Sequence, residues 1–244
     1  MYRGIKKVRS THSLYTMFRT KTVLILIPAR GGSKRIPYKN RRLLKGKPLL
    51  TYAIEAARKS KFADRILVST DDEKIARIAQ KAKAEVPFLR PKNISGDRVP
   101  TVAAVLHALD FLETSGWVPD IVVVVQPTSP LVRSSDIDSA ISTLISSGAN
   151  TCVSVTRASE RPEWMFKKVG AKWKQYAPTK LSRRSQELSE LFHLNGAVYA
   201  ALAPFVFHRK QLIDTQHTAA IVMPKERSID IDTKEDWKAA ERAI

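Results

Sequence analysis

Residues 28–40 have the composition of an anion-binding loop. Two adjacent glycines, Gly31 and Gly32, follow a short apolar run, and no acidic residue occurs before Glu55. Glycines let the backbone approach a ligand closely and present N–H groups to it, while clustered cations attract negative charge. The segment therefore favours a polyphosphate site, although two glycines after a strand can also form a simple turn. Its basic side chains are Arg30, Lys34, Arg35 and Lys39.

Two aspartates near the C-terminus have the spacing of a cation site. Asp230 and Asp232 are two residues apart in a segment that reads as extended, so their carboxylates point to the same side. Mg²⁺ usually takes one or two protein carboxylates and completes its shell with phosphate oxygens and water. A structural alternative stays open for Asp232, because it also suits the N-cap of a following helix with Glu235 in a capping box.

Polar residues also follow two other apolar runs, at positions where open α/β sheets collect their ligands. Arg90 ends the run 85–89, and its guanidinium either pairs with acceptor atoms of a nucleobase or remains a solvated charge. Gln126 follows a fully apolar run, 121–125, and opens a Gln-Pro-Thr-Ser-Pro segment. That segment either contacts a ligand or only turns the chain.

The elements that must position these residues alternate between strand and helix. Short runs rich in β-branched residues predict strands, and apolar residues at helical spacing predict helices between them. This alternation is typical of a mostly parallel sheet covered on both faces, a three-layer Rossmann-like α/β fold. The predicted strands are 23–28, 65–69, 85–89, 121–126, 152–157, 196–201 and 220–224, and the predicted helices are 48–60, 72–83, 101–113, 135–147 and 234–243.

Two segments stand outside this alternation. Residues 158–194 contain Pro162, Pro178 and aromatic side chains that include Trp164, Phe166 and Trp173, without a clear period, and so long an excursion usually serves binding or association. Residues 1–22 are basic and rich in Ser and Thr, ahead of a domain at 23–244. They predict a disordered extension, a mistaken start with Met17 as the true one, or an organellar presequence.

Composition narrows the class of protein. Of the 244 residues, 43% are hydrophobic and 27% are charged, and no apolar run reaches the roughly 20 residues that cross a bilayer. The single cysteine, Cys152, lies in an apolar run, which predicts a buried thiol in a cytosolic protein. The net charge of +19 keeps a nucleic-acid-binding protein open as a rival, but the sequence has no helix-turn-helix, zinc-finger or paired-aromatic motif to support it.

Taken together, the motifs resemble those of the CMP-N-acylneuraminate synthetases, or acylneuraminate cytidylyltransferases. Residues 28–40 are similar to that family's first motif, ARGGSKGIPxKN, with Arg35 in place of the last glycine. The related Kdo cytidylyltransferases lack the GGSK run. Further matches follow in the family's order along nearly all of residues 23–244, at 46–49 (GKPL), 69–72 (STDD), 89–91 (LRP), 126–131 (QPTSPL), 195–199 (NGAVY) and 228–233 (SIDIDT).

The resemblance implies a cytoplasmic nucleotidyltransferase that joins CMP from CTP to the anomeric hydroxyl of an acidic nine-carbon sugar and releases pyrophosphate. It further implies Mg²⁺ as cofactor, a homodimer formed through an arm at about 158–195, and neither nucleic acid nor membrane as partner. The implied residues are Arg30, Gly31, Gly32, Ser33, Lys34, Lys39, Asn40, Arg90 and Thr101 for the nucleotide, Gln126, Arg184, Gln186, Asn195 and Tyr199 for the sugar, Asp230 and Asp232 for the metal, and Arg30, Lys39, Asp230 and Asp232 for catalysis.

The chain departs from the family pattern near the expected sugar site. Relatives commonly carry an RRQ-like segment, and some carry a further arginine before the NGA motif, where this chain has Arg184-Ser185-Gln186 and His193. Contact with the sugar carboxylate then falls to Arg183 or Arg184, or is weaker. A catalytically silent relative that binds only the nucleotide is therefore an alternative function.

Overall fold

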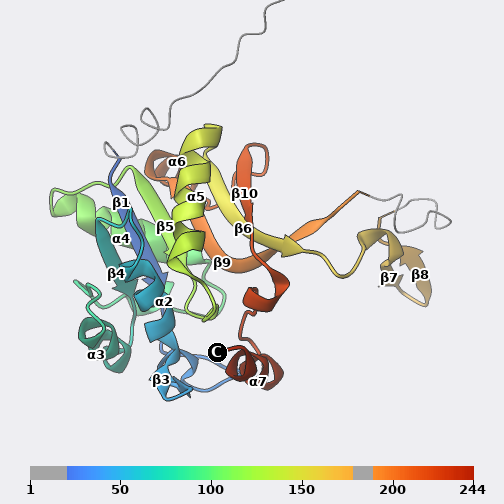
Figure 1. Ribbon diagram of the computed structural model, residues 1–244, viewed down its shortest axis with the longest axis horizontal. Coiled ribbons are helices and arrows are strands. Elements are labelled where there is room, and N and C mark those ends of the chain that lie inside the picture. The colour runs from blue at the N-terminus through green and yellow to red at the C-terminus, as the bar shows by residue number, and fades with distance from the viewer. Residues whose placement is uncertain (1–20, 178–188) are drawn as a thin grey trace, which may run out of the picture.

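The computed structural model describes residues 21–177 and 189–244, and Figure 1 shows how their strands and helices are arranged. The strands are β1 (Val23–Pro28), β2 (Leu43–Leu44), β3 (Lys47–Pro48), β4 (Arg65–Ser69), β5 (Ile121–Val125), β6 (Thr151–Arg157), β7 (Phe166–Val169), β8 (Lys172–Gln175), β9 (Phe192–Leu202) and β10 (Thr218–Val222). The α-helices are α2 (Leu49–Arg58), α3 (Glu73–Lys81), α4 (Thr101–Thr114), α5 (Ser134–Ser147), α6 (Ala203–Arg209) and α7 (Lys234–Ala243). Single 3₁₀ turns are η1 (Lys39–Arg41), η2 (Lys92–Ile94), η3 (Pro162–Trp164) and η5 (Lys225–Arg227).

Six strands form one mixed sheet in the order β10-β6-β9-β5-β1-β4. β1 runs parallel to both of its neighbours, with Leu26 opposite Leu67 of β4 on one side and Val124 of β5 on the other. β9 is the exception, because it runs antiparallel to β5 and β6. The carboxyl ends of β1, β4 and β5 therefore meet at one edge of the sheet, and the predicted site motifs begin there.

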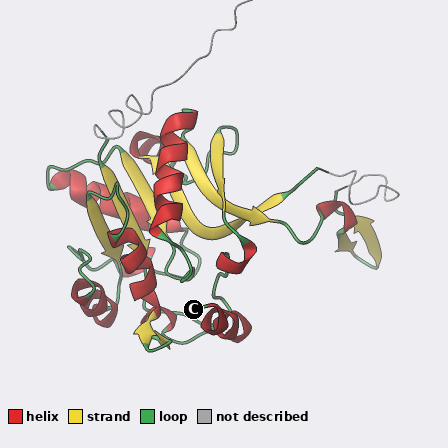
Figure 2. Ribbon diagram, in the orientation of Figure 1, coloured by secondary structure: helices red, strands yellow, loops and turns green. Residues whose placement is uncertain are grey.

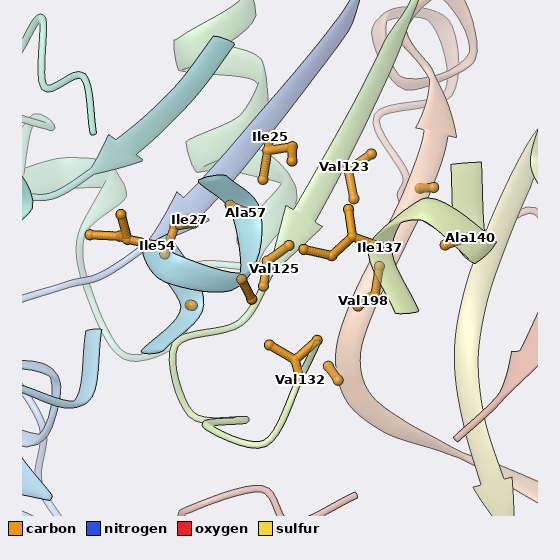
Figure 3. Close-up of a cluster of buried hydrophobic side chains, with 14 of the residues drawn as sticks. Ile25, Ile27, Ile54, Ala57, Val123, Val125, Val132, Ile137, Ala140 and Val198 are labelled. Atoms are coloured by element: carbon orange, nitrogen blue, oxygen red, sulfur yellow. The ribbon is translucent and has the colours of Figure 1, made fainter. Parts of the chain in front are cut away.

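Helices cover both faces of this sheet, which gives three layers (Figure 2). On one face α2, α3 and α5 pack over side chains that include Ile25, Ile27 and Val123 (Figure 3). On the other face α4 and α6 pack over side chains that include Leu24 and Val122. Successive residues of a strand point to opposite faces, so strands buried on both faces are apolar throughout. The predicted three-layer α/β fold is confirmed.

Most predicted elements are present, but the predicted strand 85–89 is wrong. This segment makes only isolated parallel bridges to β4 and the residue after it, Glu85 with Leu67 and Leu89 with Thr70. Pro87 lies between the two bridges and has no N–H to donate, so a regular ladder cannot continue through it. Helix α6 and the β7–β8 hairpin were not predicted. The hairpin stands apart from the sheet, beyond the extended ends of β6 and β9 (Figure 1).

Helix α7 begins at Lys234, as predicted, but its N-cap is not the residue that the sequence offered for that role. Thr233 is the N-cap, and its hydroxyl accepts the N–H of Asp236 while the Asp236 carboxylate accepts the N–H of Thr233. The expected cap at Asp232 with Glu235 is therefore wrong by one residue. Asp232 instead lies in the extended segment before the helix, where its carboxylate faces the amino-terminal loop.

A small apolar cluster holds this C-terminal segment against the residues that follow the glycine loop after β1. Ile231 and Trp237 pack there with Ile36 and Leu44. The backbone N–H of Ile231 also donates to the carbonyl of Thr128, in the turn after β5, at 2.8 Å. Residues near the two ends of the chain are therefore brought to the same edge of the sheet.

The folded domain begins slightly earlier than expected. Thr22 donates its N–H and its hydroxyl to the Asp120 carboxylate at 2.8 and 3.0 Å, and Lys21 pairs with the same group at 3.1 Å. These two residues were assigned to the extension, whereas its remainder, residues 1–20, lies outside the described residues. Within the described part of the chain, no helix is long and apolar enough to cross a membrane.

Candidate active site

A cleft of about 530 Å³ opens at the carboxyl ends of β1 and β5, and we call it the main cleft. Its walls come from the glycine loop, the segment from Arg90 to the start of α4, the turn after β5, and Asp232. A volume of this size is typical of small-ligand sites. Five basic side chains and two acidic ones line it, and these are Arg30, Lys34, Arg35, Lys39 and Arg90, with Asp97 and Asp232.

The two glycines of the loop have different surroundings. A Cβ atom added to Gly31 would lie 2.8 Å from the Cβ of Asp72, so the loop can approach the turn after β4 only with glycine here. The Gly31 N–H donates to the Asp71 carboxylate at 2.9 Å, so this group is not directed at a ligand. Gly32 has open space around it and lines the main cleft. Of the pair, Gly32 is therefore the one placed for ligand contact.

Asp97 is an acidic member of the cleft that the sequence reasoning missed. It contacts the guanidinium of Arg30 and the ammonium of Lys34, the latter at 2.8 Å. Hydrogen bonds from Lys34 and then Arg30 hold the pKa of the Asp97 carboxyl below its ordinary value. The sequence held one indication of this residue, because Asp97 is the single acidic residue between Glu85 and Asp110.

Lys39 is the most enclosed cation of the glycine loop. Its side chain is 12% exposed, and its Nζ donates to the Ile231 carbonyl at 2.6 Å and to Asp232 Oδ1 at 3.0 Å. Arg35, which is 69% exposed, donates to the other oxygen of Asp232 at 3.0 Å. These bonds join the loop after β1 to the segment before α7.

Asn40 is buried beside the same loop and has an unused acceptor. Its Nδ2 donates to the Arg30 carbonyl at 3.0 Å, which fixes the backbone that carries the arginine. Its Oδ1 has no hydrogen-bond partner among the described residues. Because buried polar atoms are rarely left unpaired, this oxygen suits a hydroxyl or amino donor of a ligand. Ser33 also lines the main cleft.

Arg90 and Thr101 form the opposite end of the main cleft. Arg90 is 7% exposed, and its Nε donates to Ser95 Oγ at 3.1 Å. Burial lowers the pKa of this guanidinium, while the nearby Asp71 carboxylate acts in the opposite direction. Thr101 is the first residue of α4, whose N-cap, Pro100, makes no side-chain capping bond. Uncapped N–H groups at a helix start favour ligand acceptor atoms.

Asp230 is an exposed residue two positions before Asp232. Desolvation of the Asp230 carboxyl raises its pKa, a hydrogen bond from Thr128 lowers it, and the charge of Asp232 raises it further. Two carboxylates that repel each other are a suitable pair of ligands for a divalent cation. Of the predicted pair, Asp232 lines the main cleft, whereas Asp230 does not.

A second hollow of about 450 Å³, the side cleft, adjoins the main cleft and shares Pro100, Thr101 and Gln126 with it. Tyr199 of β9 lines it, together with a segment that the sequence reasoning did not single out, 210–213. Burial, followed by the charge of Asp230, raises the pKa of the Tyr199 hydroxyl. Gln126 and Tyr199, both predicted sugar ligands, are thus placed in one hollow.

The other predicted sugar ligands are not gathered there. The Asn195 side chain is buried, where its oxygen accepts from Ser154 Oγ at 2.6 Å and its Nδ2 donates to Ser228 Oγ at 3.0 Å. This amide is therefore engaged with the protein itself. Arg184 and Gln186 lie outside the described residues.

Comparisons with known proteins identify the family of this chain. A family profile described as "Cytidylyltransferase" matches residues 24–239. The chain is 33% identical to the pseudaminic acid cytidylyltransferase of Campylobacter jejuni subsp. jejuni, over 89% of this chain and 94% of that protein. It is also 33% identical to the CMP-N,N'-diacetyllegionaminic acid synthase of Legionella pneumophila subsp. pneumophila, over 91% and 96%.

A solved structure supports the fold independently. The structure of CMP:2-keto-3-deoxy-manno-octonic acid synthetase complexed with CTP superposes with a TM-score of 0.69 at 16% identity, over 91% of this chain and 97% of that one. At this identity the likeness concerns the fold alone. The profile match and the two relatives, each covering most of the chain, decide the family. This chain belongs to the cytidylyltransferase family.

Proposed function

We propose that this protein transfers CMP from CTP to the anomeric hydroxyl of a sialic-acid-like nonulosonic acid and releases pyrophosphate. The observation that carries the proposal is the main cleft, where the four basic side chains of the glycine loop meet Arg90 beside two carboxylates. The relatives named above are enzymes of pseudaminic and legionaminic acid activation by their names, which supports an acidic nine-carbon sugar as acceptor.

The triphosphate would lie along the glycine loop. Gly32 leaves room for it, and the same loop supplies positive charge from Arg30, Lys34 and Lys39. Charge-assisted bonds from such groups to phosphate oxygens are stronger than neutral ones. The unpaired Asn40 oxygen would accept a ribose hydroxyl at the same wall.

The cytosine would lie at the other end of the main cleft, against Arg90 and Thr101. Cytosine presents a carbonyl oxygen and a ring nitrogen as acceptors, and the Arg90 guanidinium is a donor that the site has already desolvated. The start of α4 offers further backbone donors. A uracil ring carries an N–H at the position of the cytosine ring nitrogen, so this arrangement favours CTP over UTP.

In the reaction, the anomeric oxygen of the sugar forms a bond to the α-phosphorus as the bond between that phosphorus and the pyrophosphate oxygen breaks. The hydroxyl loses its proton, and pyrophosphate leaves with its negative charge next to the loop cations. Positioning of the two substrates and stabilisation of developing charge supply most of the rate in phosphoryl transfer. Arg30 and Lys39 are placed for the second role.

Asp230 and Asp232 would hold Mg²⁺. They fit this ion because they are two neighbouring carboxylates, of which Asp232 lines the main cleft and Asp230 has its pKa raised by desolvation and by the charge of Asp232. When bound, the ion would polarise phosphate oxygens and offset negative charge. Lys39 and Arg35 orient Asp232 beside this position through the bonds described above.

The sugar would occupy the side cleft. Gln126 lies on the boundary of the two clefts, so a sugar held by Gln126 and Tyr199 would meet a nucleotide in the main cleft.

We further propose that the enzyme is a homodimer. Eight of the exposed large apolar side chains lie on the predicted arm and the strand next to it, namely Trp164, Met165, Phe166, Val169, Trp173, Tyr176, Phe192 and Leu194, and a second copy would cover them. The lone buried Cys152, with no disulfide partner, suits action in the cytoplasm.

The decisive experiment measures pyrophosphate release by the purified protein with CTP and Mg²⁺, offered a panel of nonulosonic acids. We expect release with at least one sugar of the panel and none without sugar, and Asp230→Asn serves as the inactive control. Tight binding of CTP without release from any sugar would instead support the catalytically silent relative. Failure to bind CTP would contradict the proposed function as a whole.

A further inference from the structure

Asp71 occupies the middle of three parallel segments at the edge of the sheet. It follows β4 by two residues, and β4 has β1 on one side and the segment 85–90 on the other. Backbone bonds continue past the strands, from Ala29 N–H to the Ser69 carbonyl at 2.9 Å and from Arg90 N–H to the Thr70 carbonyl at 2.7 Å. The Asp71 side chain is therefore bracketed by the glycine loop and by Arg90.

Its carboxylate bonds to the loop on the first side. Oδ1 of Asp71 accepts the N–H of Gly31 at 2.9 Å. The same loop is pressed against the neighbouring Asp72, because an added Cβ on Gly31 would lie 2.8 Å from that side chain. The bond from Asp71 thus fixes the backbone from which Arg30 and Gly32 reach the main cleft.

On the second side the carboxylate faces a buried cation. Asp71 Oδ1 lies 3.9 Å from Nη2 of Arg90, whose side chain is 6% exposed. Burial disfavours the charged guanidinium and Arg30 repels it, whereas Asp71 is the neighbour that favours its charge. A buried cation that loses its counter-charge is strongly destabilised in its position.

We propose that Asp71 is a positioning residue that couples the two halves of the nucleotide site. One carboxylate oxygen holds both the loop that receives the triphosphate and the guanidinium that reads the base. This inference rests on the proposed function, because it takes CTP as the ligand of the main cleft. It assigns a purpose to the first aspartate of the Ser-Thr-Asp-Asp motif, whereas the second caps helix α3 by accepting the N–H groups of Lys74 and Ile75 at 2.7 and 3.2 Å.

The test uses equilibrium binding of CTP, UTP and inorganic tripolyphosphate to the full chain, without sugar. Asp71→Asn keeps an oxygen for the Gly31 N–H but removes the charge that faces Arg90. We expect it to weaken CTP binding about tenfold while the dissociation constant for UTP changes about twofold, so that discrimination between the bases falls about fivefold. Tripolyphosphate binding should stay within about twofold of the parent, since the loop is still held.

Asp71→Ala removes both contacts, so tripolyphosphate binding should also weaken, by about fivefold. Asp72→Asn is the matched control, because it removes one negative charge next to Asp71 while asparagine caps a helix as well as aspartate does. We expect it to leave all three affinities unchanged. Thermal melting of each variant reports folding, and Asp71→Asn alone carries the test if the alanine variant is insoluble.

The outcomes separate this inference from the proposed function. Wild-type protein that binds no CTP would overturn the proposed function. Wild-type protein that binds CTP, together with an Asp71→Asn variant that keeps the parent's preference for CTP over UTP, would overturn the positioning role of Asp71.

Discussion

Replacing Lys39 with methionine should reduce both turnover and stability, because its ammonium group connects the glycine loop to the segment before helix α7. Methionine has nearly the length of lysine, so the side-chain volume is kept while the charge and two hydrogen bonds are lost. The lost bonds run to the Ile231 carbonyl at 2.6 Å and to Asp232 at 3.0 Å.

The effect on stability follows from the surroundings of the two acceptors. A hydrogen bond from a charged donor to an enclosed acceptor contributes about 1.5 to 3 kcal/mol. Asp232 is 51% exposed, so its ion pair with Lys39 adds less than about 1 kcal/mol. The total is about 1.5 to 4 kcal/mol, which for a domain of this size lowers the melting temperature by roughly 3 to 16 °C.

The effect on catalysis should be larger. A preorganised charge next to developing phosphate charge contributes a factor of about 10² to 10³ in kcat. Lys34→Met is the matched control, because Lys34 belongs to the same loop but is 86% exposed and pairs only with Asp97 among the described residues. We expect its kcat to fall by about tenfold at most, with no change in melting temperature.

The assay is pyrophosphate release at saturating CTP and sugar, with melting curves of both variants. A Lys39→Met enzyme that loses stability but keeps kcat within about threefold of the parent would limit Lys39 to a structural role. Equal losses of kcat in both variants would refute the argument that the enclosed ammonium of Lys39 contributes more to catalysis than the exposed one of Lys34.

Three further predictions test neighbouring residues. Asp230→Asn should abolish turnover yet raise the melting temperature of the metal-free protein at neutral pH, because the raised pKa of Asp230 means that its charged form opposes folding. This destabilisation is absent at low pH and develops as pH rises through the folded pKa, so melting curves against pH check the sign. Asp97→Asn should lower the dissociation constant for CTP roughly twofold to fivefold, since Asp97 competes with phosphate for Arg30 and Lys34; weaker binding in a titration would instead show that Asp97 preorganises them. Asn195→Ala should lower stability by about 2 kcal/mol in urea unfolding, because it removes the hydrogen bonds that the buried amide makes with Ser154 and Ser228, and a raised KM for the sugar without loss of stability would contradict this buried role.

The alternation of elements was readable from local pattern. β-branched apolar runs and amphipathic periods depend on neighbouring residues only, so the bounds of β1, β4 and α4 were predicted within a residue. The pattern failed where context decides. Segment 85–89 has strand composition, but Pro87 leaves it only two bridges, and β7–β8 is a hairpin exposed to solvent on both faces, without the alternation that marks a half-buried strand.

The glycine loop and Gln126 were predicted to share one edge of the sheet, because parallel strands bring their carboxyl ends together, whereas Asp230 and Asp232 were paired by their spacing alone. Which side chains pair within that site was decided only by tertiary structure. Lys39 meets Asp232 across 193 residues of sequence, and Asp71 meets Arg90 because the segment 85–90 lies beside β4. Asn195, polar and next to a glycine, has the sequence character of a ligand but turns inward to bond Ser154 and Ser228. Such partnerships depend on the order of strands in the sheet and on the packing of returning segments, and no local sequence pattern contains either.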